Sequence, residues 1–490
     1  MRTSGILCHI SSLPSPYGIG TYGKKAYEFV DFLVEAKQTY WQLLPLGPTS
    51  YGDSPYQTFS AFANNPYFID LEMLIEEKLL LNLEIKDDVK NPKYVDYNAL
   101  YNQRYIALRK AFTRFDKKQN EFLSFLKKES YWLEDYALFM AIKSSFDGQS
   151  WLYWDEDIRL RKPEALARFK EQLKDEIDFQ KFLQFKSYTQ WYKLKKYANK
   201  KGIKLIGDMP IYVSYDSSDV WANPKMFQLD EKNVPTHVAG VPPDNYAIEG
   251  QLWGNPLYHW KHMEDTKYQW WIDRVKAAIE MFDMVRIDHF IGFVNFYSIP
   301  YGDINARKGV WIKGPGKKVF DAIKNALGDI QIIAEDLGVV TPEVKQLLED
   351  VGYPGMKLLQ FGFSANEDSD YLPHHYHENV IAYTGTHDNM TSASWFEQLS
   401  QEDLAFALSY MNCCSSQNKV ECLIKETMKS HANTVIIPIQ DFLHLKDDAR
   451  MNIPSTLGGN WQWRLTEKQI NKNLEKHIAK MTRLYSRDKK

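Results

Sequence analysis

The chain has few cysteines, little net charge and no long apolar run, and each shortage argues against a class of protein. Its 490 residues include 4 cysteines and carry a formal net charge of −3. Such a charge gives no basic field for a nucleic acid or an anionic membrane surface. No apolar run approaches the roughly 18–20 residues that a membrane-spanning helix needs. We therefore expect a protein that binds neither nucleic acid nor membrane.

The positions of the cysteines in the sequence also differ from those of a disulfide framework or a zinc site. Cys413, Cys414 and Cys422 lie close together, whereas Cys8 stands far away. They form no Cys-x-x-Cys pair and have no matching histidines for zinc. We expect no disulfide framework and hence a reducing compartment. The N-terminus has no charged region followed by an apolar one, as a signal peptide would, so the sequence predicts a cytoplasmic protein. The tail from Ser486 is expected to fray.

Aromatic residues are, in contrast, abundant, at 14% of the chain with 14 Trp and 30 Tyr. A chain of this length can bury a large core, and many of the rings are expected to fill it. Aromatic rings also suit the flat C–H faces of sugars. We expect both uses, because one binding site cannot employ so many rings.

Short apolar segments alternate with amphipathic ones along the chain. Alternating strands and helices predict a parallel sheet, and eight repeats predict a closed barrel. The expected fold class is therefore α/β, a (β/α)8 TIM barrel with large insertions between its strands. The expected strands are residues 5–10, 40–44, 204–207, 281–287, 330–334, 356–361, 380–383 and 435–439.

Two insertions interrupt an otherwise single barrel of residues 1–490. Residues 70–200 are mostly helical in pattern and are interpreted as a subdomain packed on the barrel rim. Residues 215–260 are rich in Pro, Asn, Asp and aromatics, which predicts irregular loops at the active-site rim. Long ordered loops in a compact domain are usually functional. The helices expected in the first insertion are residues 102–115, 120–128, 134–145, 163–176 and 179–200.

Three short acidic motifs each follow an expected strand. They are RIDH, with Arg286 and Asp288, AEDLG, with Glu335, and GTHDN, with His387 and Asp388. A βαβ unit takes roughly 30 or more residues. The interval from Asp288 to Glu335 therefore fits one unit with a long loop, and the interval from Glu335 to Asp388 fits two units. The three acids are thereby placed on the fourth, fifth and seventh strands. Their C-terminal edge is where β/α barrels build active sites.

Each motif has a structural and a chemical interpretation. Arg286 and Asp288 share one face of a strand, where the guanidinium favours the ionised carboxylate that a nucleophile needs. Glu335 lies between Ala334 and Leu337, and desolvation there would raise its pKa and suit a general acid. The alternatives are a structural ion pair, an exposed acidic turn and, for GTHDN, an Asx-type turn. On one barrel edge, the three together favour a retaining glycosidase-type site with a third, stabilising acid.

A group of histidines, His374, His375 and His377, follows Pro373 in an expected loop. Because no carboxylate stands at ligand spacing, we expect a polar loop without a metal. The expected glycosidase-type reaction also needs no metal and no cofactor, since the carboxyl groups supply the proton and the negative charge that it requires.

The motifs, together with IGDMPIYV, resemble the α-amylase superfamily. Two longer runs, LPLGPTSYGDSPYQTFSAFANNPYFID and GQLWGNPLY, narrow the resemblance to the amylomaltases, the 4-α-glucanotransferases of glycoside hydrolase family 77. The resemblance extends from GILCHISSLPSPYGIG to GGNWQWR, nearly the whole chain. It implies transfer of α-1,4-glucan segments among maltooligosaccharides or glucans derived from starch or glycogen.

The resemblance also implies roles for particular residues. Asp288 matches the family's nucleophile, Glu335 its acid/base and Asp388 its transition-state stabiliser. Ser364, Glu249 and Ile453 depart from the residues usual at their positions, which concerns the subsites only. Residues matching substrate-binding positions are Arg286, His387 and Asp208 in the catalytic subsite, Tyr51, Ser54, Tyr56, Gln251 and Trp253 in the donor and acceptor subsites, and Asn460 in a loop near the cleft.

Other functions remain open on the sequence alone. An α-amylase-type hydrolase would use the same three acids with water as acceptor. A silent glucan-binding protein would require the loss of a catalytic acid, and all three are present. A metal-dependent barrel hydrolase would need a paired histidine motif on the first strand, where only His9 stands.

Overall fold

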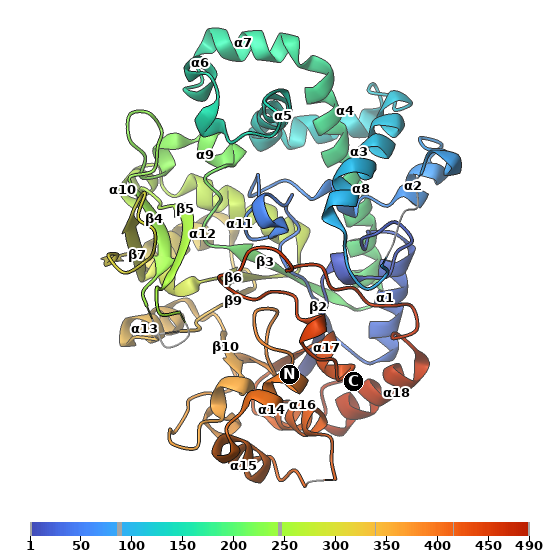
Figure 1. Cartoon of the computed structure of the whole chain (residues 1–490), viewed down its shortest axis with the longest axis vertical. Coiled ribbons are helices and arrows are strands. Elements are labelled where there is room, and N and C mark those ends of the chain that lie inside the picture. The colour runs from blue at the N-terminus through green and yellow to red at the C-terminus, as the bar shows by residue number, and fades with distance from the viewer. Residues whose placement is uncertain (1, 86–90, 244–246, 339, 415, 489–490) are drawn as a thin grey trace.

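Eight parallel strands form the central sheet of the computed structural model, which describes residues 2–85, 91–243, 247–338, 340–414 and 416–488 (Figure 1). Their order is β10-β11-β12-β1-β2-β3-β6-β9. The outermost strands also meet, because the Ala334 N–H of β9 donates to the Pro354 carbonyl before β10 at 2.9 Å. The sheet is thus a nearly closed barrel. The strands are β1 (Thr3–Leu7), β2 (Tyr40–Gln42), β3 (Lys204–Pro210), β6 (Met284–Asp288), β9 (Ile332–Ala334), β10 (Gly355–Leu358), β11 (Val380–Tyr383) and β12 (Thr434–Pro438).

The expected (β/α)8 barrel is confirmed, and each expected segment overlaps one barrel strand. Several predicted bounds differ from those of the strands, and two of the differences have a local reason. The first strand ends at Leu7 because the 3-10 helix η1 (Ile10–Ser12) soon follows, and the sixth ends at Leu358 because η8 (Leu359–Gly362) begins there. Strands β11 and β12 are buried along their whole length, as expected of a parallel sheet covered on both faces.

A helical insertion fills the long interval between β2 and β3 and lies at the top of Figure 1. Its longest helix, α8, has 27 residues and packs against α5. Phe112, Phe122 and Phe182 belong to a hydrophobic cluster separate from the main core. This cluster supports our proposal of a helical subdomain, and helices lie in all five predicted places. They are α2 (Leu71–Glu76), α3 (Tyr97–Thr113), α4 (Asn120–Lys128), α5 (Ser130–Ser145), α6 (Glu156–Arg159), α7 (Pro163–Gln172) and α8 (Lys174–Lys200).

A second, antiparallel sheet lies beside the barrel in the order β5-β4-β7-β8. The prediction of irregular loops for residues 215–260 is therefore wrong in part. Its strand β4 pairs with β7, which follows β6 and lies outside the segment, so the segment's own composition carries no signal for this pairing. The strands are β4 (His237–Val241), β5 (Gln251–Pro256), β7 (Asn295–Pro300) and β8 (Val310–Lys313).

The other helices pack mainly around the barrel. The C-terminal helix α18 packs against α1, so the two ends of the chain lie on the same side. No helix among the described residues is long and apolar enough to cross a membrane. These helices are α1 (Lys24–Glu35), α9 (Ser218–Ala222), α10 (Trp260–Asp265), α11 (Gln269–Met281), α12 (Lys317–Leu327), α13 (Pro342–Val351), α14 (Ser392–Gln398), α15 (Gln401–Tyr410), α16 (Lys419–Lys429), α17 (Ile439–Phe442) and α18 (Lys472–Leu484).

Two structural features of the C-terminal third differ from expectation. Arg487 is fully buried, and its guanidinium donates to backbone carbonyls that include those of Thr3, Met428 and Ala432. The expected fraying is therefore wrong at this position, because these carbonyls anchor the side chain. Residues 489 and 490 of the expected tail lie outside the described residues.

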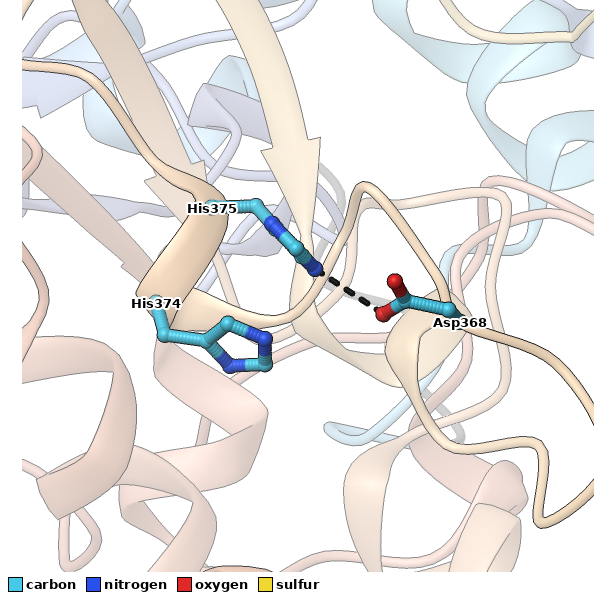
Figure 2. A group of neighbouring side chains, drawn as sticks. All are labelled: Asp368, His374 and His375. Carbon is cyan, nitrogen blue, oxygen red and sulfur yellow. Dashed lines mark hydrogen bonds and ion pairs between the residues drawn. The ribbon is translucent and has the colours of Figure 1, made fainter.

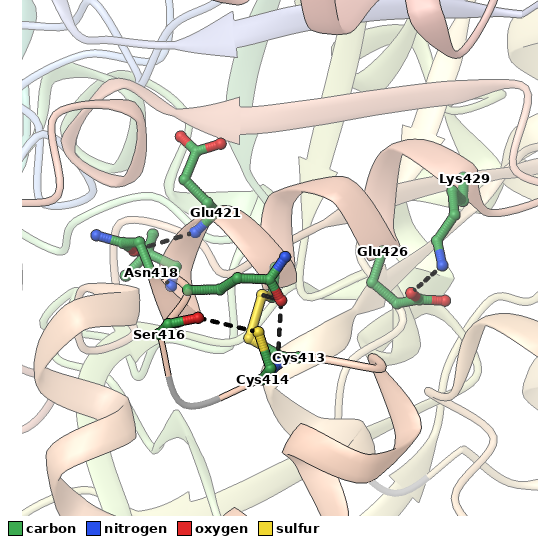
Figure 3. The surroundings of a disulfide bond; sticks show 10 residues. Cys413, Cys414, Ser416, Asn418, Glu421, Glu426 and Lys429 are labelled. Atoms are coloured by element: carbon green, nitrogen blue, oxygen red, sulfur yellow. Dashed lines mark hydrogen bonds and ion pairs between the residues drawn. A yellow bond between two sulfur atoms is a disulfide. The ribbon is translucent and has the colours of Figure 1, made fainter.

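The second unexpected feature is a disulfide between Cys413 and Cys422, shown in Figure 3. The turn between α15 and α16 reverses the chain and brings the two Cα atoms to 6.0 Å. Cys8 and Cys414 are free, the first buried and the second exposed. One bridge is no framework, but its presence was not predicted, because the spacing of cysteines does not reveal a chain reversal.

Candidate active site

The C-terminal edge of the barrel gathers the acidic residues of the sequence motifs. Asp208 of β3 lies opposite Arg286 of β6 in the sheet register. Asp288 is the last residue of β6, and Glu335 directly follows β9. Asp388 lies in the loop after β11. The expected placement on the fourth, fifth and seventh barrel strands therefore matches the structure.

Arg286 joins two of the carboxylates. Its Nη1 donates to both oxygens of Asp208, at 2.8 and 2.7 Å, and its Nη2 lies 2.9 Å from Oδ1 of Asp288. Burial alone would lower the pKa of Arg286, but the two carboxylates outweigh it and hold the pKa well above its usual value. The Asp208 side chain is 0% exposed and that of Asp288 is 27% exposed. Of the pair, Asp288 is the carboxylate that a ligand can reach.

Glu335 has different surroundings. Its Oε2 accepts the His289 N–H and its Oε1 accepts the Leu337 N–H, each at 2.7 Å. The side chain is buried, and burial raises the pKa of Glu335 to about 8, with Asp288 adding to the rise while Arg286 and the two N–H groups oppose it. A carboxyl group with this pKa carries a proton near neutral pH, as a general acid must.

A left-handed residue, His289, links Asp288 of one strand to Glu335 after the next through a backbone hydrogen bond. His289 has φ 53°, and this conformation directs its N–H, one residue after Asp288, toward Glu335. The sequence motif included His289 but gave it no role. A positive φ at a non-glycine residue cannot be read from composition, although histidine tolerates it better than most residues.

Asp388 is fixed by contacts from a distant loop. Its Oδ1 accepts the Asn452 Nδ2–H at 2.6 Å, and its Oδ2 lies 3.3 Å from His387 Nε2. Arg450 donates to its backbone carbonyl. The side chain is 41% exposed, so a ligand can reach it. Asn389 Oδ1 accepts the Thr386 N–H, three residues before it, at 2.8 Å, which is not the bond of the Asx-type turn considered as the alternative, because that turn uses an N–H two residues further on.

Tyr56 links the two sides of the site. Its hydroxyl donates to Asp208 Oδ2 at 2.7 Å, and its ring stacks on His387 with centroids 5.2 Å apart and an interplanar angle of 6°. Trp461 lies against both rings, at 5.7 Å from Tyr56 and 5.8 Å from His387. Burial and the nearby carboxylate of Asp208 raise the pKa of Tyr56 well above its usual value, so the hydroxyl keeps its proton.

Trp253 and Gln251 approach the site from the antiparallel sheet. The Trp253 ring meets the His289 ring edge to face, with centroids 4.8 Å apart. Its Nε1 donates to Gln251 Oε1 at 3.1 Å. Both residues therefore lie beside the strand that ends in Asp288. Strand β5 brings them there, which explains why residues 215–260 border the site although they are not simple loops.

Two of the remaining predicted residues, Ser54 and Asn460, stabilise loops through hydrogen bonds to the backbone. The Ser54 hydroxyl accepts the Tyr56 N–H at 3.2 Å and shapes the turn before that ring. Asn460 is buried, accepts the Ile453 N–H at 3.0 Å and donates to Thr456, so it braces the loop that follows Asn452. The side chain of Tyr51 lies outside what the structure describes.

The contact between Asn452 and Asp388 was not predicted from the sequence. Asn452 stands in MNIPST, in a loop after the eighth strand, and has no acidic neighbour to mark it. Its backbone N–H donates to the His387 carbonyl at 3.1 Å, while its side chain binds Asp388. Only the three-dimensional meeting of two loops reveals this role.

A parallel barrel with a proton-bearing carboxyl, a reachable carboxylate and flanking aromatics at one edge defines a carbohydrate-active enzyme. A family model described as 4-alpha-glucanotransferase, of glycoside hydrolase family 77, matches residues 8–470. A 4-alpha-glucanotransferase of Clostridium butyricum is 49% identical over 98% of this chain and 99% of the relative. One of Thermus thermophilus is 45% identical over 96% of both chains.

A solved structure extends this similarity to three dimensions. Amylomaltase from Streptococcus agalactiae in complex with acarbose is 42% identical, covers 100% of both chains and has a TM-score of 0.98. The chain therefore belongs to glycoside hydrolase family 77, the 4-α-glucanotransferases.

Proposed function

We propose that the chain moves an α-1,4-glucan segment from a donor maltooligosaccharide to the 4-hydroxyl of an acceptor glucan or glucose, with retention of configuration. The observation that carries this proposal is the contrast between two neighbouring carboxyl groups. Asp288 is reachable and paired with Arg286. Glu335 is buried and has a pKa raised to about 8, chiefly by burial. One is suited to attack carbon and the other to give a proton.

The first step breaks the glycosidic bond. Glu335 gives its proton to the glycosidic oxygen, the bond from that oxygen to the anomeric carbon breaks, and the shortened glucan leaves. An oxygen of Asp288 attacks the anomeric carbon and forms an ester. Arg286 holds this carboxylate in position through its 2.9 Å contact. Asp388, supported by Asn452, faces the developing positive charge in our proposal.

The second step restores the enzyme. The acceptor 4-hydroxyl attacks the anomeric carbon and gives its proton to Glu335, while the ester bond to Asp288 breaks. Each step inverts the anomeric carbon, so the product keeps the donor's configuration. Glu335 acts as acid in one step and base in the other, which a carboxyl with a pKa of about 8 can do near neutral pH.

The surrounding residues are proposed to bind the sugar. Asp208 and Tyr56 keep Arg286 and His387 in place, and His387 would contact hydroxyls of the ring in the catalytic subsite. Trp253, with Gln251, would provide an aromatic platform for an acceptor ring and reduce access of water. Ser54 and Asn460 would act through the loops that they hold. We propose the same general function, subsite binding, for Tyr51 from its motif.

Incubation of the purified chain with maltotriose tests the proposal. A ladder of longer maltooligosaccharides plus glucose, with almost no rise in reducing ends, is expected of a transferase. Shorter products alone, with reducing ends rising in step, would mean that water is the acceptor. The same assay with long α-1,4-glucans of starch or glycogen as donors tests the proposed range of substrates.

We also infer a cytoplasmic location, as the low cysteine content suggests. The bridge between Cys413 and Cys422 argues against this location, because disulfides are rare in reducing compartments, so the location needs a direct test. Cell fractionation is expected to recover the transfer activity with cytoplasmic markers. Recovery from the medium or an envelope fraction would contradict it.

A further inference from the structure

A second cluster of chemically active side chains lies on the surface loop between β10 and β11. Asp368, His374 and His375 each offer a ligand atom, and these atoms all lie within 4.8 Å of one another. Figure 2 shows both imidazoles and the carboxylate directed toward a common space. All three side chains are exposed, so a cation from solution can reach them.

We predicted that no carboxylate stands at ligand spacing from these histidines, and this premise is wrong, because Asp368 lies within reach of both rings. Asp368 Oδ1 lies 2.9 Å from His375 Nε2, because the loop turns back before the short helix η9 (Pro373–His375). The Ser369 hydroxyl donates to the Phe361 carbonyl at 3.1 Å and helps to hold that turn. The fold, not the order of residues, completes the set of ligands.

The donor set matches a particular class of cation. Two imidazole nitrogens and one carboxylate oxygen suit zinc, at bond lengths of about 2.0–2.2 Å, with water as the fourth ligand. Around a tetrahedral zinc ion, ligand atoms stand about 3.4 Å apart. Small rotations of these exposed side chains would therefore bring the ligand atoms from their present spacing to that of a zinc site. His375 and Asp368 already form the closest pair.

A supporting contact orients the His374 ring. Its Nδ1 lies 2.8 Å from the hydroxyl of Tyr410, at the end of α15. The other ring nitrogen, Nε2, faces His375 and Asp368 (Figure 2). Histidines that bind metals commonly use their second ring nitrogen in such a contact, which fixes the ring and its tautomer. The ring of His375 lies beside it, with centroids 4.0 Å apart.

We propose that Asp368, His374 and His375 form a zinc-binding site separate from the catalytic residues. In this site the ion replaces the direct contact between His375 and Asp368 and joins the loop to α15 through His374 and Tyr410. The bound ion stabilises the folded state, because the unfolded chain does not hold the three ligands together.

Zinc titration of the untagged full-length protein tests this site. Protein freed of metal is titrated with zinc chloride against a chromophoric zinc chelator, and the midpoint of thermal unfolding is measured with and without zinc. The ligand variants are Asp368→Asn, His374→Ala and His375→Ala. The matched control is His377→Ala, which removes an exposed imidazole from the same loop. Tyr410→Phe tests the supporting contact.

The wild type and His377→Ala are expected to bind one zinc ion at this site and to gain thermal stability from it. Tyr410→Phe is expected to lose about tenfold in affinity, and each ligand variant more than that. All variants should unfold as the wild type does in metal-free buffer. Absence of zinc binding by the wild type would overturn the proposal and leave an ordinary surface ion pair. Equal binding by wild type and ligand variants, or equal loss in His377→Ala, would also overturn it.

Discussion

At the scale of single residues, the site shows how one chemical group serves two purposes. Asp288 and Glu335 are both carboxylic acids near Arg286. Asp288 contacts the guanidinium directly and meets solvent, whereas Glu335 is enclosed and accepts only backbone N–H groups among its described hydrogen bonds. Environment, more than residue type, separates the proposed nucleophile from the proposed acid.

The raised pKa of Glu335 predicts the alkaline limit of activity. The first step needs its protonated form, which prevails below a pKa of about 8 and is lost above it. We expect kcat/KM for maltotriose to fall about tenfold per pH unit above that value, because kcat/KM reports the free enzyme's essential groups.

Initial rates across pH, with stability checked at each value, measure this limb. Glu335→Gln is expected to lower kcat/KM by about 10²–10⁴-fold and to abolish the limb. An alkaline limb that persists in this variant would assign it to another group.

At the scale of elements, two interactions hold the C-terminal third of the chain in place. Arg487 joins the end of the chain to β1 and to the segment before β12, and the disulfide joins the segment after α15 to α16. Neither has a hydrogen bond or ion pair to the three acids among the described residues, so we expect them to govern stability and not the chemistry.

Replacement of Arg487 by alanine is expected to destabilise the fold. The change leaves several buried carbonyls without their donor, which lowers the free energy of unfolding by about 3 kcal/mol. Arg483→Ala, on the exposed side of α18, is the matched control. Denaturant unfolding compares the two, and equal midpoints would contradict the anchoring role.

The disulfide predicts a second stability difference. Cys422→Ser opens a loop between positions 9 residues apart and is expected to lower the free energy of unfolding of the oxidised protein by about 2–3 kcal/mol. Cys414→Ser removes a neighbouring free thiol and should change little. Unfolding in the absence of reductant measures both. If added reductant lowers the stability of Cys422→Ser as much as that of the wild type, the bridge is not the cause.

At the scale of the whole molecule, the barrel and its acidic edge could be predicted because their signals are local. Apolar runs mark the strands, and Asp288 ends its strand while Glu335 directly follows its own. The whole antiparallel sheet could not be predicted, since β4 pairs with β7 beyond a barrel strand as well as with β5 in its own segment. Asn452 was missed because it meets Asp388 only where two distant loops come together in the fold, and Asp368 was missed because a turn within its own loop brings it to His375.

The division of work between Asp288 and Glu335 is the central claim, and trapping the covalent intermediate tests it most directly. In Glu335→Gln, α-maltotriosyl fluoride can still react, because fluoride leaves without a proton, whereas the second step lacks its base. Intact mass spectrometry is expected to show one added maltotriosyl group, and peptide mapping to place it on Asp288. Asp288→Asn should form no adduct. An adduct on another residue, or one that forms equally in Asp288→Asn, would contradict the assignment.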